Sequence, residues 1–113
     1  MKIITERLSL DELNKMAVQM FKDMVKAVVD VDRELIAVDA ELHSDLEALL
    51  LQDGSKQGNL WGINLYPEAP EEEFIQFDSM INLRPSAGNK SRGVEDEGIR
   101  QKITVVVAKR ISR

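Results

Sequence analysis

The stretch Val25–Ala37, VKAVVDVDRELIA, alternates between apolar and polar residues and predicts a half-buried β-strand. The apolar parity consists of Val25, Ala27, Val29, Val31, Leu35 and Ala37. The other parity is mostly charged, with Lys26, Asp30, Asp32 and Glu34. Arg33 interrupts the apolar parity, so we expect the strand to bulge or bend there.

An amphipathic helix is expected before this strand. Ser9 and Glu12 have the spacing of a capping box, in which each side chain satisfies a backbone N–H at the start of a helix. Apolar residues then recur every three or four positions from Leu10 to Met24. The pattern predicts a helix over residues 10–24, after a short strand or extended lead-in at residues 2–5.

Residues 41–52, ELHSDLEALLLQ, fit two structures. Their leucines have helical spacing, and Leu, Glu and Ala favour helix by propensity. The same residues also alternate as a strand would, with His43, Asp45 and Glu47 on the polar face. We predict the strand, because the turn signal Asp53-Gly54-Ser55 leads directly into a further strand-like segment.

Two later segments are also predicted to be strands. They are residues 60–66, LWGINLY, with Trp61 on the core parity, and residues 74–84, FIQFDSMINLR. Both end in I-N-L-x directly before a proline, Pro67 or Pro85, which we interpret as two strands that end at similar prolines, since proline cannot donate to a central ladder.

The last segment, about residues 96–111, is predicted to be a helix. Asp96 or Glu95 can cap it, and five apolar residues from Ile99 to Ile111 have helical spacing. A terminal strand over ITVVVA is the alternative, because β-branched residues are slightly unfavourable in helices.

Turn positions alone give the register of an antiparallel meander of about four strands. They place Asp32 opposite Glu47, Asn64 opposite Gln76, and Leu65 beside both Leu46 and Ile75. All of these registers collect the apolar residues on one face. We therefore predict a single α+β domain over residues 1–113, with the N-terminal and C-terminal helices packed on the apolar face and the other face open.

The open face would be acidic. Asp32, Asp45 and Glu47 would lie close together, where carboxylates repel unless a hard cation, a basic partner or solvent screens them. A weak divalent metal site is the functional interpretation, and a solvated face is the one we favour. His43 could pair with Asp45 for general base work or metal ligation, although a surface histidine without such a role is the preferred interpretation.

The loop that follows Leu83 is locally basic in an acidic protein. Its candidate anion-binding residues are Arg84, Ser86, Asn89, Lys90 and Arg92. Guanidinium groups and backbone N–H groups of such a loop can hold a phosphate or carboxylate. The alternative is an ordinary flexible connection whose charges aid solubility.

Composition narrows the remaining possibilities. The 113 residues contain no Cys and one His, which excludes disulfides, thiolate metal sites and intrachain sites that need two imidazoles. A net charge of −5 and few aromatic residues argue against nucleic-acid binding. No targeting segment or membrane span is visible, so a cytoplasmic protein is expected.

Four segments together resemble a known family. They are KAVVDVDREL (26–35), ALLLQDGS (48–55), LWGINLYP (60–67) and INLRPSAGN (81–89). The chain resembles a family of small uncharacterised prokaryotic proteins, the domain of unknown function DUF 5674. The resemblance implies a bacterial or archaeal protein with a helical C-terminal segment, and it implies no activity, cofactor or catalytic residue.

The leading functional hypothesis is a non-enzymatic binding or interaction module that self-associates. It follows from the lack of a recognisable catalytic motif and from the exposed sheet surface that the predicted fold leaves. The alternative is a small enzyme or ligand-binding protein for an anionic, phosphorylated metabolite, with a divalent cation on the acidic face.

Overall fold

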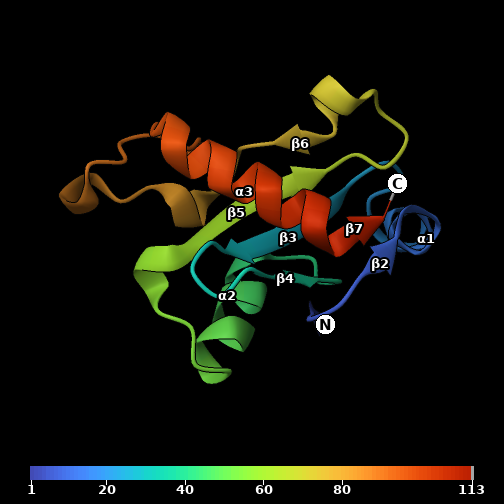
Figure 1. The fold of residues 1–113 in the computed structure, drawn as a ribbon, viewed down its shortest axis with the longest axis horizontal. Helices are drawn as coiled ribbons and strands as arrows, with labels where there is room; N and C mark the ends of the chain where they lie inside the picture. The colour runs from blue at the N-terminus through green and yellow to red at the C-terminus, as the bar shows by residue number, and fades with distance from the viewer. Residues whose placement is uncertain (113) are drawn as a thin grey trace.

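A computed structural model describes residues 1–112 and contains an antiparallel sheet with helices on both of its faces (Figure 1). The helices and strands, in chain order, are β1 (Lys2–Ile4), β2 (Leu8–Ser9), α1 (Leu10–Met20), β3 (Val25–Asp30), β4 (Leu35–Val38), α2 (His43–Gln52), β5 (Leu60–Leu65), β6 (Ile75–Gln76), α3 (Glu97–Arg110) and β7 (Ile111–Ser112). Short 3-10 helices lie in the connections: η1 (Gln57–Asn59), η2 (Glu71–Glu73), η3 (Met80–Asn82) and η4 (Pro85–Ala87).

The main sheet has the strand order β1-β4-β3-β5-β6, and every neighbouring pair in it is antiparallel. A separate parallel pair joins β2 to β7. The α+β class and the antiparallel sheet are therefore confirmed. The predicted meander is wrong in its middle, because β4 and β5 lie on opposite sides of β3 and the chain crosses between them through α2.

The segment predicted as a single strand over residues 25–37 is a hairpin. β3 ends at Asp30, and the chain turns over residues 31–34 with Glu34 in the left-handed region at φ 57°. The Asp30 side chain stabilises this turn by accepting hydrogen bonds from the backbone N–H groups of Asp32 and Arg33, each at 2.9 Å. The turn changes the parity, so Leu35 and Ala37 face the opposite side of the sheet from Val25, Ala27 and Val29.

Residues 41–52 do not form the predicted strand, since α2 occupies His43–Gln52. Leu46 and Leu50 lie one helical turn apart, are fully buried, and pack on Val28 and Leu35 in a second core cluster. Intrinsic helix propensity is thus reinforced by burial. The face of the sheet that was predicted to stay open is covered by this helix.

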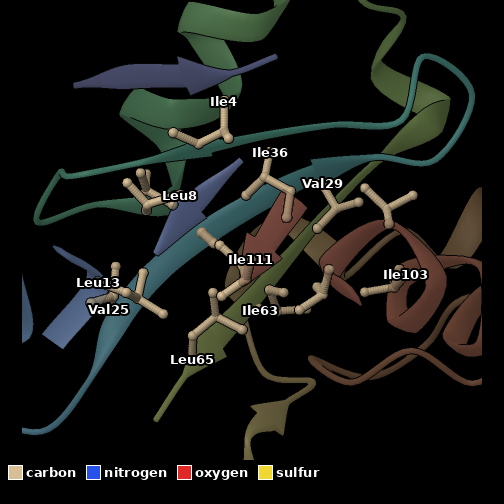
Figure 2. Packing of buried hydrophobic residues seen from close by; sticks show 14 of the residues in the cluster. Ile4, Leu8, Leu13, Val25, Val29, Ile36, Ile63, Leu65, Ile103 and Ile111 are labelled. Atoms are coloured by element: carbon tan, nitrogen blue, oxygen red, sulfur yellow. The ribbon is translucent and has the colours of Figure 1, made fainter. Parts of the chain in front are cut away.

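The other face carries the larger core, and its predicted cover by the two terminal helices is confirmed. Figure 2 shows Val25, Val29, Ile63 and Leu65 of the sheet packed among side chains that include Leu13 of α1 and Ile103 of α3. The β3 residues in this cluster, Val25, Ala27 and Val29, are those of the predicted apolar parity. Trp61 joins the same cluster, as its parity predicted.

The terminal helices begin where the sequence predicts. Ser9 Oγ accepts from the Glu12 N–H at 3.1 Å, and Asp96 Oδ1 accepts from the Ile99 N–H at 3.0 Å. α1 ends at Met20, four residues earlier than predicted, and Lys22 follows it with φ 75°. Within residues 1–112, no helix is long and apolar enough to span a membrane.

Candidate functional site

The segment predicted as a long strand over residues 74–84 pairs with β5 only at Ile75 and Gln76. The predicted partners there, Asn64 with Gln76 and Leu65 with Ile75, are confirmed. Beyond Gln76 the chain leaves the ladder and forms η3 and η4. The candidate site lies at this departure, so the interactions that hold the loop to β5 come first.

The buried Asn82 side chain takes the place of a strand partner for β5. Its Oδ1 accepts from the Gly62 N–H at 2.8 Å, while its Nδ2 donates to the Gly62 carbonyl at 2.9 Å and to the Arg92 carbonyl at 3.0 Å. The loop approaches so closely that a Cβ added to Gly62 would lie 2.5 Å from Ser79 Cβ. A glycine is therefore required at position 62 for this packing.

Asn89, a predicted anion-binding residue, organises the next turn of the loop instead. Its side chain is buried, with Nδ2 donating to the carbonyls of Asn82, Ser91 and Gly93 at 2.7, 3.1 and 2.8 Å. Its Oδ1 accepts from the Glu95 N–H at 2.9 Å. The loop is thus fixed by internal hydrogen bonds, unlike the flexible connection considered as the alternative.

Two of the three guanidinium nitrogens of Arg84, Nε and Nη2, are held by hydrogen bonds. Its Nε donates to the Ile81 carbonyl at 3.1 Å, its Nη2 donates to the Leu60 carbonyl, and its guanidinium lies 4.6 Å from the centre of the Trp61 ring. Burial lowers the pKa of Arg84, and the charge of Glu47 acts in the opposite direction. Among residues 1–112, Nη1 of Arg84 has no hydrogen-bond partner.

Two hollows meet at Arg84, and we call them together the Arg84 cleft. The first, the Trp61 lobe, has a volume of about 490 Å³, and the second, the Glu47 lobe, about 450 Å³. Gly58, Arg84 and Ala87 line both lobes. Each volume lies within the range of small-molecule sites in proteins.

The two residues that name the lobes each carry a polar atom without a partner. Glu47 Oε2 and Trp61 Nε1 are shielded from solvent, and neither has a hydrogen-bond partner in the part of the chain that the structure describes. Buried polar atoms are normally satisfied, so these two are exceptions. Because both are shielded, a ligand in the cleft reaches them only after a side-chain movement.

The five predicted anion-binding residues do not converge on one point. Ser86 lines the Glu47 lobe and Asn89 lines the Trp61 lobe, with Arg84 between them. Lys90 and Arg92 line neither lobe. Arg92 pairs with Asp78 at 2.8 Å, and so its charge is already compensated.

Most backbone N–H groups of the loop are also already used. Those of Ala87, Gly88 and Asn89 donate to carbonyls within the loop. The Lys90 N–H donates to Glu95 Oε2 at 2.6 Å. The Lys90 N–H therefore already has a carboxylate acceptor from this part of the chain.

The predicted metal ligands do not share a sheet face. Asp32 lies in the β3–β4 turn, whereas Asp45 and Glu47 lie on α2. Within residues 1–112, no group of three or more His, Asp or Glu side chains could hold a metal ion. The metal prediction required residues 42–51 to be a strand, and the helix removes that geometry.

His43, expected at the surface, is buried at the start of α2. Its Nε2 lies 2.8 Å from the Ile63 carbonyl oxygen and must donate to it, because a carbonyl can only accept. Burial lowers the pKa of His43. The histidine therefore ties α2 to β5 through this contact with Ile63, which corrects the preferred interpretation of a surface histidine.

Sequence reasoning also missed a second polar cluster, at the far end of α2. Ser55 Oγ donates to the fully buried Asp30 Oδ2 at 2.6 Å, and Arg33 donates to Ser55 Oγ at 2.8 Å and to Asp53 Oδ2 at 2.7 Å. These contacts join the end of β3 and the β3–β4 turn to the loop after α2. We assign this cluster to stability rather than to chemistry.

A signal for the main site was present in the repeated I-N-L-x-P pattern. In a strand, an asparagine between two apolar residues points to the opposite face of the sheet, and it is buried only where another element covers that face. A buried amide then needs partners. Asn64 and Asn82 are both buried, and Asn82 holds the loop to β5. The repeat marks two asparagines that organise the loop rather than two similar strand ends.

Comparison with known protein families gives one description, "Protein of unknown function (DUF5674)", which matches residues 2–110. No curated protein matches the sequence, and no solved structure matches the fold.

Proposed function

This chain belongs to the DUF5674 family, and from that premise we propose that it is a non-enzymatic binding module whose ligand occupies the Arg84 cleft. The description of the family names no activity, so the proposal rests on the geometry of the cleft.

One observation carries the proposal: Arg84 and Glu47 line the same lobe. Oε2 of Glu47 is shielded and has no hydrogen-bond partner within residues 1–112, and the hydrogen bonds of Arg84 use its Nε and Nη2 but not its Nη1. The donor is Nη1 of Arg84 and the acceptor is Oε2 of Glu47. Arg84 is held by its other nitrogens, so its orientation costs a ligand little conformational entropy. Oε2 is shielded, and a rotation of the Glu47 side chain would bring it to a ligand.

The chemistry of the walls favours a ligand that both accepts and donates hydrogen bonds. Glu47 lines one lobe, and Glu95 and Asp96 line the other, so carboxylates outnumber the single guanidinium. A neutral carboxamide or peptide group offers an oxygen for Arg84 and an N–H for Glu47. The apolar side chains of Met80 and Leu83 border the Glu47 lobe and would contact the carbon skeleton.

An anionic ligand is the second candidate. It is favoured by the presence of the Arg84 guanidinium and the Ser86 hydroxyl in one lobe, since both donate to phosphate. The nearby carboxylates oppose it, and Lys90 and Arg92 lie outside the cleft.

A titration followed by amide NMR separates the two candidates. Isotope-labelled protein is titrated with inorganic phosphate and, separately, with a blocked dipeptide. We expect the dipeptide to shift the amides of Gly58, Arg84 and Ala87. Phosphate shifts at these residues, without dipeptide shifts, would replace the first candidate by the second, and no shift there with either probe at millimolar concentration would refute the cleft as a ligand site.

The variant Glu47→Met separates the two candidates independently, because it should change the affinities for the dipeptide and for phosphate in opposite directions. Methionine keeps the length of the side chain and removes the acceptor and its charge. Dipeptide binding should weaken about tenfold, as expected for the loss of a hydrogen bond to a charged group. Phosphate binding should strengthen, because a repelling carboxylate is gone. Ser44→Ala, on the exposed side of α2, serves as the control and should change neither.

Self-association is the second part of the proposal. The open sheet face that first suggested it does not exist, because α2 covers it. Exposed apolar side chains remain on the helices, among them Val18 of α1 and Val105 of α3, with exposed fractions of 65% and 61%. Sedimentation equilibrium tests this part, and a strictly monomeric protein would contradict it.

A further inference from the structure

The outward side of α3 carries an uncharged row of side chains. In Figure 1 this helix crosses in front of β3 and β5, and no other element lies in front of it. Gly98, Gln101, Val105 and Ala108 are all exposed and recur at steps of three, four and three residues. This is the spacing of the contact seam of a two-stranded coiled coil. α3 therefore has one apolar side toward the core and a second, largely uncharged side toward solvent.

Hollows flank this row on both sides. One, of about 490 Å³, lies between α3 and the β3–β4 turn and is lined by Val31 and Val106. The other, of about 440 Å³, is lined by Phe77. Gln101 and Val105 border both hollows. The row is thus a ridge between two partly apolar grooves, and such a surface can fit a second copy of itself.

The charges beside the row favour one arrangement of two copies. Glu97 and Lys102 stand on opposite sides of it, and neither side chain has a partner within residues 1–112. They are five positions apart in the sequence. In a parallel two-stranded coiled coil, a residue beside the seam of one helix pairs with the residue five positions later on the other helix. Lys109, at the next flanking position, already pairs with Glu34 at 2.5 Å.

We propose that α3 of one copy packs against α3 of a second copy in parallel, around a twofold axis along the helices. Val105 and Gln101 then meet their own counterparts, and Glu97 of each copy faces Lys102 of the other. A twofold arrangement is closed, so it stops at the dimer. This inference rests on the proposed self-association and assigns its surface; it is independent of the Arg84 cleft.

Sedimentation equilibrium of the full chain over a range of concentrations tests the surface. The wild type should dimerise, and Val105→Asp should weaken the dimer at least about tenfold, because it places two carboxylates at the seam. Val18→Asp is the matched control, since Val18 is exposed to nearly the same extent on a different helix. A wild-type monomer would overturn both self-association and the surface, whereas a dimer that Val105→Asp leaves intact would overturn only the surface.

Charge exchange and cross-linking test the orientation. Glu97→Lys should weaken the dimer, and the double change Glu97→Lys with Lys102→Glu should restore it. The chain contains no cysteine, so Gln101→Cys gives a single thiol per copy. In the parallel pair this thiol meets its counterpart, and an added oxidant that takes up the two electrons and two protons links the two copies by a disulfide. If Gln101→Cys cross-links no faster than Val18→Cys, the parallel arrangement is wrong.

Discussion

Asp30 offers the sharpest test of how the fold is held together, because three donors converge on one buried carboxylate. Its oxygens accept from the N–H groups of Asp32 and Arg33 and from the hydroxyl of Ser55, at 2.9, 2.9 and 2.6 Å. The carboxylate thereby joins the β3–β4 turn to the loop after α2. Replacing Asp30 with alanine removes all three contacts at once.

The expected magnitude follows from the surroundings of each donor. A hydrogen bond to a charged group contributes about 1.5–3 kcal/mol when both partners are buried. Ser55 is buried, whereas the two N–H donors lie in a turn that water can reach after truncation, so their loss is partly compensated. We therefore expect Asp30→Ala to lower the free energy of unfolding by about 3 kcal/mol, a large part of a typical total of about 5–15 kcal/mol.

Urea unfolding followed by tryptophan fluorescence measures this loss, since Trp61 is the only tryptophan. Ser55→Ala should cost about 1.5 kcal/mol, and the double variant should show a coupling of about 1–2 kcal/mol between the two sites. A loss below about 1 kcal/mol for Asp30→Ala, or additive effects in the double variant, would refute the assignment of this cluster to stability.

Three further changes test other contacts. Gly62→Ala should destabilise the fold by about 1–3 kcal/mol, since its Cβ would lie 2.5 Å from Ser79 Cβ, and a variant as stable as wild type in urea would contradict the close packing. The wild type should lose stability as the pH falls below about 6.5, because burial lowers the pKa of His43 in the folded state and the unfolded chain binds the proton first. Urea unfolding midpoints measured over the same pH range should not show this loss for His43→Gln. Arg84→Met should change the fluorescence of folded Trp61, and an unaltered spectrum would argue against the stacked guanidinium.

The terminal helices and β5 could be predicted because their signals are local. The cap at Ser9 and the cap at Asp96 each involve residues three positions apart, and apolar periodicity continues from both. The register of β5 with β6 could be predicted for the same reason, since a short loop joins them.

α2 could not be predicted in the same way because its sequence fits two periods. Leu42, Leu46 and Leu50 recur at a spacing that satisfies both an alternating strand and a helix. Interactions with distant parts of the chain decide between the two. β5 pairs with the edge of β3 that a strand at residues 41–52 was predicted to occupy, and the apolar residues on the second face of the sheet are buried by a helix. Helix propensity alone pointed to the correct structure, and the turn argument outweighed it wrongly.

The candidate site was found only in outline. Arg84, Ser86 and Asn89 were chosen for their chemistry and do border the cleft. Their roles depend on which partners the fold supplies, such as the Trp61 ring and the Leu60 carbonyl for Arg84. Those partners lie more than twenty positions away, beyond the reach of any local pattern.

A crystal structure of the protein purified from cells, without refolding or extensive dialysis, tests the central claim most directly. It should show density in the Arg84 cleft, with an acceptor atom at hydrogen-bond distance from Nη1 of Arg84 and a donor facing Glu47. Density for a bound molecule elsewhere on the protein, with only water in the cleft, would contradict the proposed function.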